Sequence, residues 1–427
     1  MPAPDLLSAV VASIDARTAD LVAWRRRIHA HPETAYTEHE TAAFVTEVLT
    51  GAGLSPRRVA GTGVVVDLGP DPRRERPAPP EGASTPADRS RRSGGRHVPG
   101  GRLALRADMD ALPVPETTRL SFASKRRGVA HACGHDIHTT ALLGATLALA
   151  ELDARGRLPR GVRAIFQPAE EAQPSGARTL VEHGVLEGVG GIFALHCDPK
   201  LDVGRLGTRI GAITAASDAV TVHVRADGGH TSRPHLTGDV VNALATVVTG
   251  LPAVLRRRLD PRIGVDLTFG SVQAGSAPNA MPSTGVLRGT LRCLDADAWQ
   301  EAGALVEPAV RAMLEPFGVE VDVEVLQGIP PVVNDERATR ALDRAAKAVL
   351  GESATELTEQ SLGGEDFAWY LRRVPGALAR LGTRTPGGTT YDLHRGDAEF
   401  DERAIAAGAK VLAGVALTES DVPAPTP

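Results

Sequence analysis

Hydrophobic residues in the first half of the chain follow two different periods, and each period predicts a different kind of element. Leucine, valine and isoleucine recur at helical spacing over residues 5–29, and a second helix is predicted over roughly 37–51. Short apolar runs at 63–67, 103–106 and 162–166 predict strands. The first two of these strands look like the two arms of a hairpin. Helices that alternate with strands are typical of an α/β fold.

Residues 70–100 separate those two arms and differ from the rest of the chain in composition. They are rich in proline, arginine, glycine and serine, and they contain almost no large apolar side chain. Such a segment cannot bury enough apolar surface to become ordered, so we expect a disordered insertion at the surface. A segment that binds a partner through its prolines or basic residues is the alternative, and the solvated insertion is favoured.

A helix at 139–151 and a strand at 190–196 continue the first pattern, which then changes after residue 211. The elements predicted next are strands at 219–225, 264–269, 286–292 and 319–325, and helices at about 238–258 and 296–316. This order fits two helices on one face of a four-stranded antiparallel sheet. We therefore expect an inserted domain, 212–326, within a larger domain formed by 1–211 and 327–427.

Composition narrows the classes of partner. The chain has 427 residues, enough for two domains, and its formal net charge of -5 with 3% aromatic residues argues against nucleic acid. Three cysteines without framework spacing indicate a reducing compartment. The N-terminus lacks a basic region before its apolar stretch, and no run of eighteen apolar residues occurs. These observations predict a cytoplasmic protein without a membrane partner.

Candidate chemistry is densest at residues 131–138, where three histidines, a cysteine and an aspartate lie close together. Cys133 and His135 are two residues apart, so their side chains can point the same way, and Gly134 permits a tight bend between them. Thiolate and neutral imidazole are preferred ligands of metals such as zinc. A chance cluster of histidines on a solvated loop is the alternative.

Further donor groups follow three of the apolar strands. They are Asp108 and Asp110, then Glu170 and Glu171, then His196. In open α/β sheets the chemistry gathers at the carboxyl ends of the strands. Adjacent carboxylates repel each other, so a metal could hold one of the glutamates while the other acts as a base. Asp110 could orient a metal-bound imidazole, or it could simply cap a loop. His394, near the C-terminus, is a further candidate.

Taken in order, these motifs resemble the M20 family of metallopeptidases and amidohydrolases. The resemblance is to the M20D branch of aminoacylases, hippurate hydrolases and IAA-amino acid hydrolases. The matching motifs cover nearly the whole chain: 27–33, 106–113, 131–136, 167–171, 229–235, 279–282, 364–367 and His394. The implied fold is α/β, with a phosphorylase/hydrolase-like zinc-peptidase catalytic domain. An inserted ferredoxin-like α+β domain would serve as lid and dimerisation domain.

The resemblance also implies a site for two divalent metal ions, zinc or else manganese, cobalt or nickel. The implied ligands are Cys133, His135, Glu171, His196 and His394. Cys133 would be shared between the ions, Glu170 would be the general base, and Asp110 would lie in the layer behind the ligands.

In the inserted domain, the resemblance implies that His230 and Asn279 reach the carbonyl or carboxylate of the substrate, with His230 acting across the interface of a homodimer. The expected function is hydrolysis of the amide bond of N-acyl amino acids or similar small conjugates. The alternatives are a dipeptidase or aminopeptidase of the same fold, and a catalytically inactive relative that only binds metal or ligand. Cys133 as a nucleophile is disfavoured, because it lies among metal donors.

Overall fold

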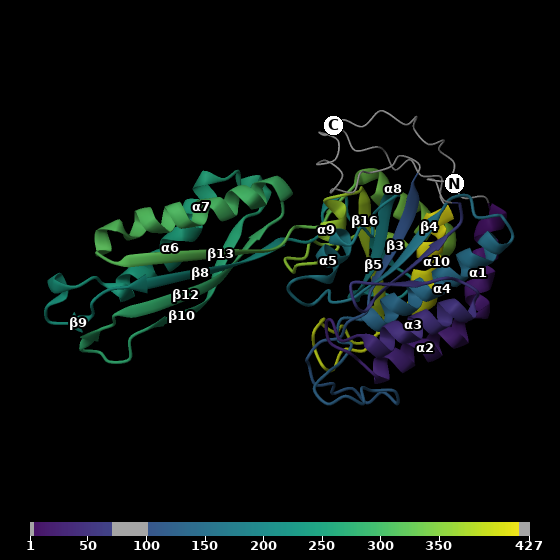
Figure 1. The fold of residues 1–427 in the computed structure, drawn as a ribbon, viewed down its shortest axis with the longest axis horizontal. Coiled ribbons are helices and arrows are strands. Elements are labelled where there is room, and N and C mark those ends of the chain that lie inside the picture. The colour runs from purple at the N-terminus through teal and green to yellow at the C-terminus, as the bar shows by residue number, and fades with distance from the viewer. Residues whose placement is uncertain (1–3, 71–100, 418–427) are drawn as a thin grey trace, which may run out of the picture. The chain divides into compact units, whose positions relative to one another are not determined.

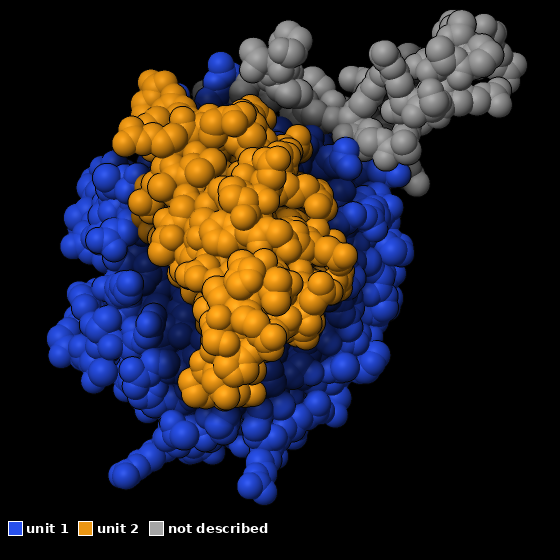
Figure 2. Space-filling view, turned by 90° about the vertical axis from the view of Figure 1, so that its left-hand side faces the viewer, with its two compact units in different colours: residues 1–211, 334–359, 369–427 blue, residues 212–333, 360–368 orange. Residues whose placement is uncertain are grey.

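The computed structural model describes residues 4–70 and 101–417, so the predicted insertion at 70–100 lies, apart from residue 70, outside the described residues. The chain divides into two compact units, coloured separately in Figure 2. Unit 1 takes the residues up to 211, 334–359 and those from 369 onward, and unit 2 takes 212–333 and 360–368. Unit 2 thus extends beyond the range 212–326 expected from the sequence.

A mixed eight-stranded sheet forms the centre of unit 1, in the order β1-β2-β4-β3-β5-β16-β6-β15. Its strands are β1 (Arg57–Val59), β2 (Gly63–Leu68), β3 (Arg102–Asp108), β4 (Val162–Gln167), β5 (Val189–Asp202), β6 (Leu206–Thr208), β15 (Thr355–Leu357) and β16 (Gly376–Arg384). The four neighbours β4, β3, β5 and β16 run parallel, so their carboxyl ends meet at one edge of the sheet. This is the edge at which the sequence places its donor groups.

The predicted hairpin of β2 and β3 is wrong. β4 lies between these two strands, antiparallel to β2 with Val64 opposite Phe166, and parallel to β3. All seven residues of β3 are buried. A strand buried on both faces and both edges belongs in the middle of a parallel sheet, whereas a hairpin would leave one of its edges open.

Helices pack against this sheet (Figure 1). They are α1 (Pro4–Ala16), α2 (Thr18–Ala30), α3 (His39–Gly51), α4 (His135–Ala154), α5 (Gly176–Glu182), α8 (Glu336–Leu350), α9 (Ala368–Leu371) and α10 (Arg403–Leu417). The single helix expected over 5–29 is two helices, because the chain breaks at Arg17. α4 is buried along nearly its whole length and contacts α1, α2, α10 and the sheet. It therefore holds its first residue, His135, in a fixed place.

A buried network of charges joins α2 to α4. Arg25 Nε donates to Asp136 Oδ2 at 2.6 Å, and His29 Nδ1 lies 2.9 Å from the same oxygen. His29 Nε2 lies 3.2 Å from Glu116 Oε1. Burial opposes the charged forms, but the two carboxylates raise the pKa of His29, and the imidazole helps to lower the pKa of Glu116 to about 2. His29 therefore has a structural role in joining α2 to α4.

Unit 2 has a four-stranded antiparallel sheet in the order β10-β12-β8-β13, with two helices on one face (Figure 1). The elements are β8 (Ala216–Arg225), α6 (Val240–Arg258), β10 (Asp266–Ala274), β12 (Thr284–Cys293), α7 (Ala296–Leu314) and β13 (Glu320–Ile329). The short strands β7 (Gly211–Ala212) and β14 (Val333–Asn334) lie where the chain passes between units. The predicted α/β class with an inserted α+β domain is confirmed.

One helix of the described residues, α6, is long and apolar enough to cross a membrane by length and composition alone. Its apolar side packs on the four-stranded sheet, with Val240, Leu244, Val247, Leu251 and Leu255 fully or almost fully buried. This packing is that of a core helix in a helix-on-sheet layer.

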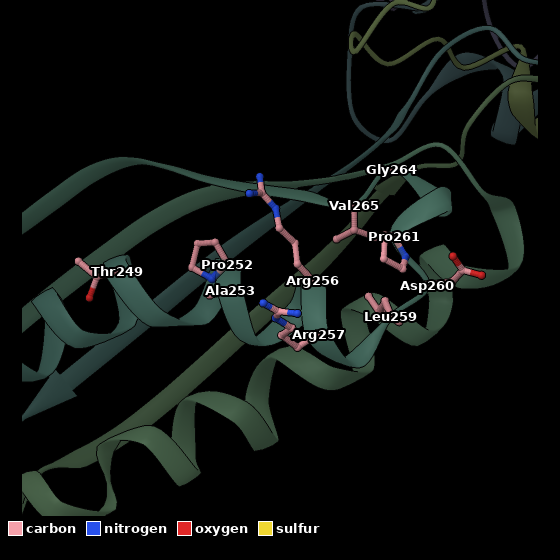
Figure 3. Close-up of a pocket in the computed structure, with 10 residues that line it drawn as sticks. All are labelled: Thr249, Pro252, Ala253, Arg256, Arg257, Leu259, Asp260, Pro261, Gly264 and Val265. Carbon is pink, nitrogen blue, oxygen red and sulfur yellow. The ribbon is translucent and has the colours of Figure 1, made fainter.

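Near the end of α6 lies a cavity of about 530 Å³ (Figure 3). Its lining includes Arg256, Arg257 and Asp260 among mostly apolar residues. None of the predicted site residues lines it, so the cavity is separate from the candidate chemistry.

Close packing at Gly144 of α4 gives a testable prediction. A Cβ atom there would lie 3.0 Å from Leu21 Cδ1 and 3.2 Å from Ala409 Cβ. We expect Gly144→Leu to lower the stability by about 1–3 kcal/mol, because extra carbons would force α2 and α10 apart. The measurement is the thermal midpoint. Gly51→Ala, where a Cβ meets nothing within 4 Å, is the control and should leave it almost unchanged. Equal midpoints for the two variants would contradict the packing described.

The His29 network predicts a pH-dependent contribution to stability. Glu116, with its lowered pKa, stabilises the fold above its ordinary pKa of 4.5 and loses this effect as the pH falls towards 2. His29, with its raised pKa, stabilises the fold below 6.5 and loses this effect as the pH rises through its folded value. His29→Gln should therefore lower the free energy of unfolding most between pH 4.5 and 6.5, by about 1–3 kcal/mol.

Denaturant unfolding of wild type and His29→Gln between pH 3 and pH 9 measures this difference. His39→Gln, which changes an exposed histidine at the start of α3, is the control and should show no such window. If the loss of stability is the same at every pH, the ion pair between His29 and Glu116 contributes nothing to stability.

Candidate functional site

Cys133, Gly134 and His135 form a tight bend that leads into α4. Gly134 has φ +84°, and a Cβ atom on it would lie 2.7 Å from Cys197 Sγ. Only glycine fits this left-handed, crowded position. Cys133 is 4% exposed and His135 is 1% exposed, so the bend brings both donors into the interior at the carboxyl edge of the sheet.

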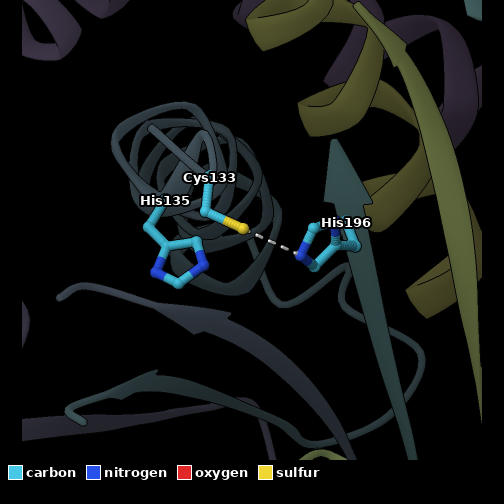
Figure 4. Close-up of side chains that lie close together, drawn as sticks. All are labelled: Cys133, His135 and His196. Carbon is cyan, nitrogen blue, oxygen red and sulfur yellow. Dashed lines mark hydrogen bonds between the residues drawn. The ribbon is translucent and has the colours of Figure 1, made fainter. Parts of the chain in front are cut away.

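His135 and His196 both direct Nε2, rather than Nδ1, towards the space beside Cys133 (Figure 4). His135 Nδ1 lies 2.9 Å from the carbonyl oxygen of Asp110, and His196 Nδ1 lies 2.8 Å from the carbonyl oxygen of Cys197. A carbonyl can only accept, so each Nδ1 carries a hydrogen and Nε2 is the nitrogen left to bind a metal. His196 Nε2 lies 3.4 Å from Cys133 Sγ. This is the tautomer that a metal-binding histidine requires.

The sequence predicted that His196 ends its strand, and this prediction is wrong. β5 continues to Asp202, and His196 pairs with Arg380 of β16. Burial, and then the nearby charge of Arg380, hold the pKa of His196 well below its ordinary value. The imidazole is therefore neutral and suited to bind a metal.

The turn after β4 carries the glutamate pair. The amides of Glu170 and Glu171 donate to the two carboxylate oxygens of Asp110, each at 3.0 Å. Asp110 was expected either to orient an imidazole or to cap a loop. In the structure its carbonyl oxygen accepts from His135 Nδ1, and its carboxylate, whose Oδ1 lies 3.4 Å from the same nitrogen, holds the glutamate turn. One residue thus connects the cysteine–histidine bend with the glutamate pair.

His394 comes from a loop near the C-terminus and has φ +64°, which is uncommon for a residue other than glycine. Its amide donates to the carbonyl oxygen of Ala132 at 2.9 Å, and its Nε2 lies 3.1 Å from Glu171 Oε1. Contacts with Cys133 and Glu171 raise its pKa to about 10. His394 thus faces Cys133 and Glu171, the two residues with which it forms a group of candidate metal ligands.

The predicted ligands and base form three groups, and within each group the ligand atoms lie within 4.8 Å of one another. The groups are Cys133 with His135 and His196, Cys133 with Glu171 and His394, and His135 with Glu170 and Glu171. Cys133, His135 and Glu171 each belong to two of them. The structure thus brings together all five predicted ligands and the predicted base, and this donor set fits divalent metal.

A second layer of buried polar groups lies behind these donors, and sequence reasoning did not assign this role to Asp108 or His138. Arg106 donates to Asp108 at 2.7 Å, and Asp108 Oδ1 lies 2.6 Å from His138 Nδ1. His138 Nε2 accepts from the amide of Cys197 at 2.7 Å, so the layer fixes the backbone beside His196. The position of His138 one helical turn after His135 was the available signal.

His230 and Asn279 lie in unit 2. β9 (Gly229–His230) pairs with β11 (Ala280–Met281), and the amide of Thr231 donates to the carbonyl of Asn279 at 3.2 Å. Both residues are exposed. The amide of Ser232 donates to His230 Nδ1 at 3.1 Å, so the ring hydrogen lies on Nε2.

Comparison with known proteins places this geometry in context. The model of the peptidase family M20/M25/M40 matches residues 104–418. A proposed glutamate–cysteine ligase of Rhodococcus jostii is 46% identical over 399 residues, which are 93% of this chain and 46% of that protein. The chain thus spans about half the length of that relative.

Other relatives match over most of their length. The N-acetyl-L-cysteine deacetylase of Bacillus subtilis is 34% identical over 387 residues, which are 90% of this chain and 84% of that enzyme. A crystal structure from the same organism, of a dinuclear metal binding peptidase from the M20 family, is 30% identical. It covers 94% of this chain and 98% of that protein, with a TM-score of 0.76. The chain therefore belongs to the peptidase family M20/M25/M40.

Proposed function

We propose that this protein is a metal-dependent amidohydrolase that cleaves the amide bond of N-acyl amino acids or similar small conjugates. The observation that carries the proposal is the overlap of the donor groups, because Cys133, His135 and Glu171 each belong to two of them and Glu170 lies in one. One thiolate common to two groups suits a pair of ions, and a carboxylate beside them suits a general base.

The ligands in this proposal are Cys133, His135, Glu171, His196 and His394. They would hold two divalent ions, with zinc favoured by the thiolate and imidazoles, and manganese, cobalt or nickel as alternatives. Burial raises the pKa of the Cys133 thiol, so without a positive partner it stays protonated. This supports a ligand role over a nucleophilic one.

When bound, the ions would polarise the amide carbonyl and lower the pKa of water. Glu170 takes a proton from the attacking water as the carbon–oxygen bond forms. It then delivers this proton to the leaving nitrogen as the carbon–nitrogen bond breaks. The Nδ1 hydrogen bonds of His135 and His196 keep both rings oriented throughout. Asp110, with its carboxylate on two consecutive amides, keeps Glu170 beside the ligands.

The substrate class is supported by the N-acetyl-L-cysteine deacetylase, which matches over most of its length. The ligase of Rhodococcus jostii extends far beyond the match, so its name says little about the matching part. A dipeptidase or aminopeptidase activity is the second candidate, favoured by the M20 peptidase structure.

We also propose roles for His230 and Asn279 as hydrogen-bond donors to the substrate's carbonyl or carboxylate, with His230 acting across the interface of a homodimer. Their support is local: they lie side by side, and His230 carries its hydrogen on Nε2, where it can be donated. A cytoplasmic location is proposed as well, supported by three cysteines that are all unpaired.

The two buried cysteines beside Gly134 offer a matched test of the ligand set. We expect Cys133→Ala to lose most of the bound metal, because it removes a thiolate that belongs to two of the donor groups. Cys197→Ala should keep about two ions per chain, since Cys197 belongs to none of the donor groups. Elemental analysis after dialysis measures both. Equal metal content in the two variants would rule out Cys133 as a shared ligand.

The role of Glu170 predicts a separate effect on turnover. Glu170→Gln should keep its metal and lose at least about 100-fold in kcat, because the amide cannot accept the proton of water. The assay uses a panel of N-acyl amino acids and dipeptides. Glu182→Gln, on the surface of α5, is the control and should match wild type.

If Glu170→Gln is as active as wild type, Glu170 is not the general base. A wild type that cleaves dipeptides but no acyl amino acid would favour the peptidase. A wild type that binds metal and cleaves nothing in the panel would point to a binding protein.

A further inference from the structure

The turn that carries the general base has an unfavourable backbone. Ala169, directly before Glu170, has φ +52° and is fully buried. For a residue other than glycine, this conformation costs about 1–2 kcal/mol. Such a conformation persists only where the surrounding structure holds it.

Two buried carboxylates hold this turn. The amide of Ala169 donates to Glu38 Oε1 at 2.8 Å, and the next two amides donate to Asp110. On the other side, the carbonyl of Ala169 accepts from the amide of Gly176 at 2.8 Å. Three consecutive amides therefore have carboxylate acceptors. Asp110 comes from the site itself, whereas Glu38 comes from the segment before α3.

Glu38 is fully buried, and all its hydrogen-bond partners are donors. Oε1 also accepts from the amide of Tyr36 at 3.0 Å, and Oε2 accepts from the hydroxyl of Thr62 at 2.7 Å. Tyr36, like Ala169, has a positive φ. One oxygen therefore stabilises two left-handed residues, one on its own segment and one beside the base.

We propose that Glu38 is a positioning residue that sets the direction of the Glu170 side chain. By holding the amide of Ala169, it fixes the left-handed turn from which Glu170 reaches the ligands. The inference rests on the proposed function for the role of Glu170. What the geometry requires at position 38 is an acceptor oxygen of the right length, which a glutamine also supplies.

The experiment compares Glu38→Met with Glu38→Gln in the metal-loaded full chain. We expect Glu38→Met to lose about 100-fold in kcat with KM within about threefold, because a base displaced by about 1 Å is that much less effective. Metal content should stay at the wild-type level. Glu38→Gln should keep most of the activity, because its oxygen can accept from Ala169 while its amide group faces Thr62.

Two controls separate positioning from stability. Thr62→Val removes the partner of the other oxygen and should leave kcat almost unchanged. Glu33→Gln changes a second buried carboxylate nearby, which accepts from the amides of Glu40 and Thr41 at the start of α3. It should lower stability without lowering kcat. If Glu38→Met does not fold, Glu38→Asp replaces it, since its shorter side chain keeps the charge but draws back from Ala169.

Amide hydrogen exchange of residues 169–171 gives a readout that does not depend on the substrate. Exchange there should speed up at least about tenfold in Glu38→Met or Glu38→Asp and stay at the wild-type rate in Glu33→Gln. If Glu38→Met and Glu38→Asp both show the wild-type exchange rate and the full kcat, the inference is overturned, even if Glu170→Gln is inactive. If wild type cleaves nothing in the panel, the proposed function fails, while the exchange data still test whether Glu38 holds the turn.

Discussion

The contacts of Asp110 are the constraint on which the arrangement of the site depends. Its carbonyl oxygen accepts from His135, and its carboxylate accepts from the amides of Glu170 and Glu171. A buried carboxylate is stable only when donors surround it. The same requirement that stabilises Asp110 therefore brings the cysteine–histidine bend and the glutamate turn together. The parallel strands β3 and β4 deliver Asp110 and the glutamate turn to one edge of the sheet.

Behind this centre, buried charged groups are linked in two chains of hydrogen bonds. The chain from Arg106 through Asp108 and His138 ends on the amide of Cys197. A second chain joins Arg25, Asp136 and His29 to Glu116. Each member limits the rotation of the next, so the donor atoms are held in place before any ion binds. The buried polar groups thus make this part of the fold rigid.

Some of the site could be predicted from the sequence because its chemistry is local. Cys133 and His135 flank one glycine, and Glu170 and Glu171 follow an apolar strand. Spacing alone indicated that these side chains could meet a metal. The pairing of β2 with β4 and the place of His196 inside β5 could not be predicted, because strand order depends on which strand needs burial on both edges. Nothing in the sequence indicated the role of Glu38, since its partner Ala169 is 131 residues away.

By itself the sequence determined the two-domain α/β class, the candidate donor residues and the resemblance to the M20 family, because periodicity and short motifs are properties of neighbouring residues. The tertiary structure alone decided how those donors are oriented. Which imidazole nitrogen carries the hydrogen, which carboxylate holds the turn and which residues adopt positive φ depend on contacts between segments far apart in the chain. Such contacts form only when the sheet and α4 pack together, since buried polar groups must then find partners among whatever side chains and amides that packing brings near.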